Sequence, residues 1–162
     1  MSTLSPHILL PLLASCLTAQ TAGDSWPAPS NIRGSEYPRV YPDNRVTFRL
    51  KAPEARKVQL QPTPGAVDNG LGKGPYEMVR DKDGIWTVTI PPGVPGLHIY
   101  HFLVDGFPTD DPGSELYFNG NRPTSGVEVP EKGYLPRDVP HGAVQEIWYH
   151  SKVIGARRRA FV

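Results

Sequence analysis

The most regular apolar stretch of the chain is Leu97-His98-Ile99-Tyr100-His101-Phe102-Leu103-Val104. Apolar side chains occur at both phases of a two-residue period, with Leu97, Ile99 and Leu103 at one phase and Tyr100, Phe102 and Val104 at the other. A run that is apolar on both faces is typical of a strand in the middle of a sheet. Turn-forming residues lie on both sides of it, at 91–96 and at Asp105-Gly106. The stretch therefore predicts a central β-strand.

Shorter strands are predicted on both sides of this one. Residues 45–51 and 58–60 alternate between apolar and polar, and residues 85–90 do so after the turn at Asp81–Gly84; residues 126–130 add a last short strand. Strands at intervals of roughly 8–12 residues, separated by turns, are typical of a β-sandwich. We therefore predict an all-β antiparallel sandwich. Its expected core is Phe48, Leu60, Trp86, Val88, Phe102 and Val104.

The composition fits this fold class and excludes some partners. The 162 residues include 16 glycines and 19 prolines, which a turn-rich all-β fold accommodates in its loops. The 17 basic and 16 acidic residues give a net charge of +1. That balance offers no electrostatic reason to expect nucleic acid as a partner. The single cysteine, Cys16, excludes an internal disulfide.

The first 22 residues have the pattern of a signal peptide. Residues 8–17 are apolar and too few to span a bilayer, and small residues follow them. We predict a secreted or periplasmic protein; the alternatives are an unstructured tail or a misassigned start codon. Leu13-Ala14-Ser15-Cys16 is similar to a bacterial lipobox. A membrane partner, and a lipid-anchored position on the outer surface, are expected only if Cys16 is lipidated; otherwise Cys16 is a small apolar residue of the leader.

The rest of the chain divides by composition. Residues 23–44 are rich in proline and polar residues and are interpreted as a linker and entry segment. Residues 45–130 hold the sandwich, and residues 131–142 are interpreted as a second linker. In residues 143–162, two segments flank Gly155 in the manner of a β-hairpin.

Three motifs carry a resemblance to a known family. They are Gly84-Ile85-Trp86-Thr87-Val88, the stretch from Gly96 to Gly106, and Asp110-Asp111-Pro112. In this order they are similar to the family-48 carbohydrate-binding module, an early-set sandwich with an immunoglobulin-like fold, over about residues 45–129. The resemblance implies an immunoglobulin-like early-set fold for the sandwich.

The flanking segments resemble a narrower group. Residues 37–43, 121–130 and 138–142 are similar to the module that precedes the catalytic domain in family-1 carbohydrate esterases, which include feruloyl and acetylxylan esterases. In those enzymes an α/β-hydrolase domain begins with a segment like residues 148–162. The resemblance implies that residues 143–162 are a hairpin fragment of an α/β-hydrolase domain, and that the full-length parent is a serine esterase.

The chain itself lacks the residues for such catalysis. An α/β-hydrolase places its nucleophile in Gly-x-Ser-x-Gly, and this pentapeptide is absent. Ser125 precedes Gly126 without the first glycine or a following helix, so it is expected to be a loop serine. His98 and His101 lie three residues apart and face opposite sides of a strand, which disfavours a shared metal site. We expect no catalytic residue, metal or cofactor in this chain.

Sugar binding is the chemistry that a sandwich of this kind supports, because aromatic rings stack on pyranose rings and polar neighbours bond the hydroxyls. The candidate residues are Trp86, Tyr100, His101, Phe107 and Tyr117. Trp86 and Tyr100 lie at apolar phases of their strands, which favours the core for both. His101 occupies the position at which starch-binding relatives have a lysine. Their two tryptophans are missing from the matching positions here, so the resemblance does not extend to a starch site.

Two functions remain open after this reading. The first is a non-catalytic accessory module of a secreted polysaccharide-degrading esterase, with a plant-type polysaccharide or the adjacent esterase domain as its partner. The second is a free-standing carbohydrate-binding or protein-interaction domain.

Overall fold

The computed structural model describes residues 25–62, 69–119, 122–131, 133 and 138–162. Within these residues every regular element is a β-strand. No described segment forms a helix of the length and hydropathy that crossing a membrane requires. The chain forms two compact units, Met1–Pro130 and Glu131–Val162. The expected signal peptide and Cys16 lie outside the described residues.

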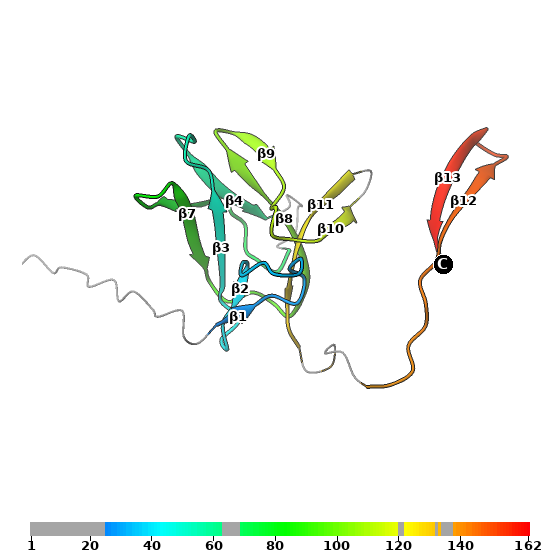
Figure 1. The fold of residues 1–162 in the computed structure, drawn as a ribbon, viewed down its shortest axis with the longest axis horizontal. Coiled ribbons are helices and arrows are strands. Elements are labelled where there is room, and N and C mark those ends of the chain that lie inside the picture. Colours follow the sequence, from blue (N-terminus) through cyan, green and yellow to red (C-terminus); the bar gives the residue numbers. More distant parts are fainter. Residues whose placement is uncertain (1–24, 63–68, 120–121, 132, 134–137) are drawn as a thin grey trace, which may run out of the picture. The chain divides into compact units, whose positions relative to one another are not determined.

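The first unit is built from two antiparallel sheets that face each other as layers (Figure 1). One sheet has the order β1-β2-β3-β7-β6, with β1 at Trp26–Pro27, β2 at Arg39–Val40, β3 at Val46–Lys51, β7 at Ile85–Ile90 and β6 at Val79–Arg80. The other has the order β10-β11-β8-β4-β5, with β10 at Leu116–Asn119, β11 at Arg122–Val129, β8 at Gly96–Val104, β4 at Val58–Pro62 and β5 at Tyr76–Glu77. The predicted all-β, immunoglobulin-like sandwich is confirmed.

The long apolar strand is central, as predicted. β8 pairs with β4 along one edge, while β11 and β9 (Phe107–Thr109) share the other. The turn from β8 to β9 has positive φ at both Asp105 and Gly106, the geometry that suits the twist of a tight hairpin. The Asp105 carboxylate also accepts the main-chain N–H groups of Arg56 and Lys57. This contact ties the hairpin to the segment that precedes β4.

The core lies between the two sheets. Phe48, Leu60 and Phe102 are fully buried and Trp86 nearly so, while Val88 and Val104 are partly buried against them. The ring of Phe48, from the first sheet, meets the ring of Tyr100, from the second, edge to face at 4.8 Å. The indole N–H of Trp86 donates to the carbonyl of Ala52 at 2.9 Å, which satisfies its polar group inside the core. The expected core residues therefore pack between the sheets.

The described part of residues 23–44, which the sequence predicts as a linker and entry segment, contains two short strands. β1 pairs with β2, and β2 pairs with β3, so this segment extends the first sheet. Val40 is fully buried, and the Arg39 guanidinium donates to the Ser25 hydroxyl at 2.9 Å. Each of these ladders is only two residues long, too short to produce an alternating pattern. A proline is tolerated in β1 because β1 is an edge strand.

The sequence also underestimated the second sheet. The last strand, expected at residues 126–130, spans Arg122–Val129, and β9 and β10 were not predicted. β10 pairs with β11 through four residue pairs, from Leu116↔Ser125 to Asn119↔Arg122. This additional strand widens the sheet beyond β11.

The second unit contains the predicted hairpin. β12 (Glu146–Ser151) pairs with β13 (Ala156–Phe161), and Gly155 has φ 64° in the connection. The indole N–H of Trp148 donates to Glu146 at 2.9 Å, and two arginine side chains lie within 6 Å of its ring. The hairpin is confirmed; its assignment to the start of an esterase-like domain stays a prediction.

Candidate functional site

The outer face of the second sheet carries the side chains that alternate away from the core. Tyr100 and Phe102 on β8 and Leu60 on β4 are fully buried on the inner face. Because successive side chains of a strand point to opposite faces, their neighbours point outward. We call this surface the outer face. Its residues are Gln59 and Gln61 on β4, Leu97, Ile99, His101 and Leu103 on β8, Arg122, Thr124, Gly126 and Glu128 on β11, and Tyr117 and Asn119 on β10.

The strand register places four of these residues in one row across the sheet. Tyr117 pairs with Thr124, and His101 pairs with Gln61. The pairing of Ser125 with Tyr100, continued by one residue, puts Thr124 beside His101. Adjacent strands lie about 4.8 Å apart, so the row runs for roughly 14 Å from β10 to β4. Tyr117 and Gln61, at the two ends of the row, are partly exposed, whereas Thr124 and His101 between them are buried, with 4% and 7% of each residue exposed.

A glycine determines where the ring of Tyr117 lies. A Cβ atom at Gly126 would stand 2.6 Å from Cδ2 and 2.8 Å from Cε2 of Tyr117, and 3.2 Å from Leu97 Cδ1. These distances mean that the ring lies directly over the backbone of Gly126, with the Leu97 side chain beside it. Any larger residue at 126 would displace the ring, so glycine in this strand permits a close approach.

His101 is a buried member of the row. Only 7% of the residue is exposed. Burial lowers the pKa of His101, and the positive charge of Arg122 lowers it further, while Asp110 acts in the opposite direction. The imidazole is therefore neutral near pH 7, with one nitrogen able to donate a hydrogen bond and the other able to accept one.

Tyr117 keeps its proton at the same pH. Burial raises the pKa of Tyr117, and the carboxylates of Glu115 and Glu128 add to the rise. The phenol therefore remains a hydrogen-bond donor beside its own apolar ring. Thr124 holds the centre of the row through a hydrogen bond from its hydroxyl to the carbonyl of Tyr100 at 3.3 Å.

The last polar groups are two side-chain amides on β4, that of Gln61 in the row and that of Gln59 next to it on the outer face. Gln59 donates to Glu77 at 2.8 Å, and Gln61 donates to the carbonyl of Pro62 at 2.6 Å. These bonds hold the two side chains, which remain partly exposed. An aromatic ring followed by neutral groups that donate and accept hydrogen bonds is an arrangement that suits a neutral polyhydroxyl ligand.

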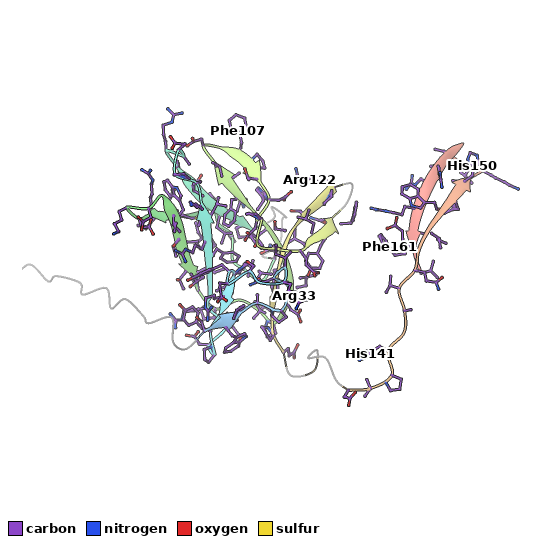
Figure 2. All side chains as sticks on the ribbon, viewed as in Figure 1. Arg33, Phe107, Arg122, His141, His150 and Phe161 are labelled. Carbon is purple, nitrogen blue, oxygen red and sulfur yellow. The ribbon has the colours of Figure 1, made fainter. Side chains whose placement is uncertain are left out.

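The structure brings together two of the five candidate residues, Tyr117 and His101. Trp86 and Tyr100 lie in the core, and the Tyr100 hydroxyl donates to Asp111 at 2.6 Å, so neither ring is free to stack on a sugar. Phe107 is 75% exposed at the start of β9, at the end of the β8–β9 hairpin (Figure 2). It pairs with Val104, which belongs to the inner phase of β8, so Phe107 is not part of the outer face.

Sequence reasoning missed the remaining members of the row and the glycine under Tyr117. Gln59 and Gln61 were visible as the polar phase of a predicted strand, which is the one signal that pointed to an outer surface. Thr124 and Gly126 lie beside Tyr117 because β11 pairs with β10. The sequence pattern did not predict β10, so it could not predict this neighbourhood. A glycine inside a strand was the available hint.

The other groups considered for chemistry have structural partners. Ser125 is fully buried, and its hydroxyl accepts the main-chain N–H of Asp111 at 2.7 Å. Both ring nitrogens of His98 lie 2.5 Å from main-chain carbonyl oxygens, those of Asn69 and Val94. Within the part of the chain that the structure describes, no group of three or more His, Cys, Asp or Glu is placed to hold a metal ion.

The comparisons with known proteins include a similarity in sequence to a much longer protein. No protein-family model matches the chain. The chain is 37% identical over 145 residues to a protein named endo-1,4-beta-xylanase/feruloyl esterase from Xylanibacter ruminicola. The alignment covers 86% of this chain and 19% of that protein, so the chain corresponds to a small part of that relative.

Solved structures give weaker similarities. Apo pullulanase from Paenibacillus barengoltzii matches with a TM-score of 0.42 and 22% identity, over 61% of this chain and 15% of that one. Ferric enterobactin esterase from Salmonella typhimurium matches with a TM-score of 0.37 and 19% identity, over 72% of this chain and 40% of that one. At TM-scores below 0.5, neither similarity supports a conclusion about function.

Proposed function

We propose that this chain is a non-catalytic, carbohydrate-binding-type module of a polysaccharide-degrading esterase, and that its outer face contacts the polysaccharide. The observation that carries the proposal is the Tyr117 ring over Gly126, at one end of a row of neutral hydrogen-bonding side chains. The similarity in sequence to a protein named as a xylanase and feruloyl esterase supports the association with such enzymes. The motif resemblance to the family-48 module supports the same proposal.

The chemistry of the row favours a neutral plant-type polysaccharide over a charged ligand. The Tyr117 phenol and the His101 imidazole are both uncharged near pH 7. Thr124 and Gln61 are neutral by nature. The charged residues Arg122 and Glu128 lie on either side of the row and have opposite signs. The row can therefore bind a ligand by stacking and by hydrogen bonds, and its four side chains carry no charge that would favour a charged ligand.

A matched pair of aromatic substitutions tests this proposal. Tyr117→Ala removes the ring from the outer face, and Phe107→Ala removes an exposed ring from the hairpin end. Removal of one aromatic ring that stacks on a ligand typically weakens the binding free energy by about 1–3 kcal/mol. In a depletion assay on insoluble arabinoxylan we expect Tyr117→Ala to weaken binding at least tenfold. Phe107→Ala should bind like the parent chain; equal binding by both variants would remove the outer face from the proposal.

We also propose that the chain has no hydrolase activity of its own. Gly-x-Ser-x-Gly is absent from the sequence, and Ser125 is buried with its hydroxyl bonded to the main chain. The purified chain should release no more feruloyl or acetyl groups from model esters than a heat-denatured sample does. Turnover that a serine-directed inhibitor abolishes would contradict this part of the proposal.

The proposal extends to the context of the chain. We propose that residues 1–22 direct export and that residues 143–162 belong to an adjoining esterase domain, which would be the second partner of the module. The hairpin of β12 and β13 is in keeping with this, because Ile147, Trp148 and Tyr149 expose 42%, 54% and 49% of their surface. Apolar side chains exposed at this level on a two-stranded sheet favour a protein partner.

A further inference from the structure

A groove lies at the other sheet of the sandwich, away from the outer face. It has a volume of about 290 Å³ and is formed by the segment before β2, the end of β3, the start of β7 and the loop that follows β9. Ligand pockets commonly measure about 300–1,000 Å³, so this groove matches a single sugar-sized group and is too small for an extended chain. None of the five candidate residues from the sequence lines it.

One wall of the groove is a tightly packed loop. A Cβ atom at Gly113 would stand 2.6 Å from the Ser35 hydroxyl and 2.8 Å from the carbonyl oxygen of Tyr37. The Ser35 hydroxyl donates to that same carbonyl at 2.8 Å, and Gly113 N–H donates to Asp111 at 2.7 Å. These contacts join the segment before β2 to the loop after β9 and fix the shape of the wall.

The acidic groups that line the groove already have partners. Glu36 forms an ion pair with Arg39 at 2.7 Å, and Arg39 also donates to Ser25. Asp111 accepts the hydroxyl of Tyr100 with one oxygen and the N–H of Gly113 with the other. The charge of Glu36 is therefore paired with that of Arg39, whereas Asp111 is held by hydrogen bonds from two neutral donors.

Two cations line the groove without a paired carboxylate. Arg49 and Lys51 lie two residues apart on β3, so they share one face of the first sheet, and both are exposed. Within the described residues, neither forms an ion pair. Asp81 interacts with Arg49 through charge, and its Oδ1 accepts the N–H groups of Asp83 and Ile85 in the turn before β7.

Tyr37 holds Arg49 in a defined position. The Arg49 guanidinium lies 5.2 Å from the centre of the Tyr37 ring, within the range of a cation–π contact. A guanidinium that lies against an aromatic ring can still bind a carboxylate through two parallel hydrogen bonds from its N–H groups. The ammonium of Lys51 adds a second positive charge on the same side of the groove.

We propose that this groove binds the carboxylate of an acidic sugar, a uronate substituent carried by the polysaccharide, through Arg49 and Lys51. This inference rests on the proposed function for the identity of the ligand as a saccharide. It assigns a second site, on the first sheet, that is selective for charge, whereas the outer face of the second sheet is selective for neutral hydroxyl groups.

The test compares two soluble xylo-oligosaccharides of equal length, one neutral and one with a single glucuronate substituent, on the full chain. Free glucuronate serves as a third probe, and binding is followed by calorimetry and by NMR shifts of main-chain amides. Two exposed ion pairs are expected to favour the substituted oligosaccharide about five- to tenfold at low salt. The preference should diminish at high ionic strength, where exposed charges are screened.

The decisive variant is Arg49→Gln combined with Lys51→Gln, and its control is Arg33→Gln combined with Lys73→Gln. The control also removes two exposed cations, neither of which lines the groove. The groove variant should bind both oligosaccharides equally and keep its melting temperature, while the control should keep the preference. A preference that persists in the groove variant, or is missing from the parent chain, overturns the inference.

Tyr117→Ala separates this inference from the proposed function. It should weaken binding of the neutral oligosaccharide and leave unchanged the NMR shifts that glucuronate causes around Arg49. If the neutral oligosaccharide fails to bind the parent chain while glucuronate still causes those shifts, the proposed function fails and the charged site stands. If only the neutral oligosaccharide binds, the charged site fails and the proposed function stands.

Discussion

The two faces of the second sheet each contain a tyrosine, and the two tyrosines are held in different ways. Tyr100, on the inner face, is fully buried between Phe48 and Phe102, and its hydroxyl donates to Asp111. Tyr117, on the outer face, lies over the backbone of Gly126 and remains partly exposed. The same sheet thus supports a tyrosine in β8 that stabilises the fold and a tyrosine in β10 that is partly exposed. Substitutions on the inner face should lower stability, and substitutions on the outer face should lower binding.

The largest contrast is expected between alanine substitutions of the two tyrosines. Tyr100→Ala empties a fully buried site and should lower the free energy of unfolding by about 3–5 kcal/mol. Tyr117→Ala removes a partly exposed ring and should lower it by about 1 kcal/mol or less. Urea denaturation followed by circular dichroism measures both values. If both variants lose the same free energy of unfolding, the inner tyrosine does not stabilise the fold more than the outer one.

A smaller effect is expected from the Tyr100 hydroxyl alone. Tyr100→Phe keeps the ring and leaves Asp111, which is 4% exposed, without its donor at 2.6 Å. An unsatisfied buried group costs about 1–3 kcal/mol, so the variant should be destabilised by that amount. The corresponding change on the outer face, Tyr117→Phe, should leave the unfolding midpoint unchanged. An unaltered midpoint in Tyr100→Phe would mean that the buried bond adds nothing to stability.

Asp111 should make the stability of the fold depend on pH. Burial raises the pKa of Asp111 above 3.8, against the hydrogen bonds from Tyr100 and the N–H of Gly113, which lower it. The folded state therefore binds this proton more tightly than the unfolded state does. The resulting contribution to stability is fully present below pH 3.8 and is lost as the pH rises through the folded-state pKa.

Comparison with Asp111→Asn isolates this contribution, because the variant has the same shape and no titrating group at that position. The stability of the parent chain minus that of Asp111→Asn should fall as the pH rises from below 3.8 towards neutrality. Denaturation at a series of pH values gives the difference directly. A difference that is constant, or that grows with pH, would contradict the direction assigned to this pKa.

The smallest substitution, a single added methyl group at Gly126, is expected to weaken binding at the outer face. Gly126→Ala adds one methyl group, which would stand 2.6 Å from the Tyr117 ring and so must displace it. Because Tyr117 lies on the edge strand β10, it can move at a cost of about 1 kcal/mol. Binding to arabinoxylan should weaken several-fold while the fold is retained. If Gly126→Ala binds like the parent chain, the position of the ring does not matter for binding.

The core was more predictable than the outer face, and the reason is physical. Phe48, Leu60 and Phe102 follow a two-residue period, and burial of one phase is enough to place them in a core without knowing which strands pair. The outer face depends on pairing. Tyr117 reaches the row through the ladder between β10 and β11, and β10 has no alternating pattern in its four residues, Leu116-Tyr117-Phe118-Asn119.

The candidate sugar-binding residues show that the sequence pattern places a residue only where it lies in a predicted strand. The phase of their strands predicts Trp86 and Tyr100 as core residues, whereas Phe107 and Tyr117 lie outside every strand that the sequence predicts. The structure places Phe107 in β9 and Tyr117 in β10, at different phases of the second sheet. The groove on the first sheet was not anticipated, because it joins residues around 35, 50 and 112 that are distant in sequence. Such contacts are not encoded in any local pattern.

The most direct test of the central claim is an NMR titration of the full chain with a neutral xylo-oligosaccharide. We expect the largest shifts at the main-chain amides of five residues that lie in or under the row of the outer face: Tyr117, Thr124, Gly126, His101 and Gln61. Amides around Phe107 and in the groove beside Arg49 should shift little. Shifts that are centred on either of those regions, or an absence of shifts at saturating oligosaccharide, would contradict the claim that the outer face binds the sugar.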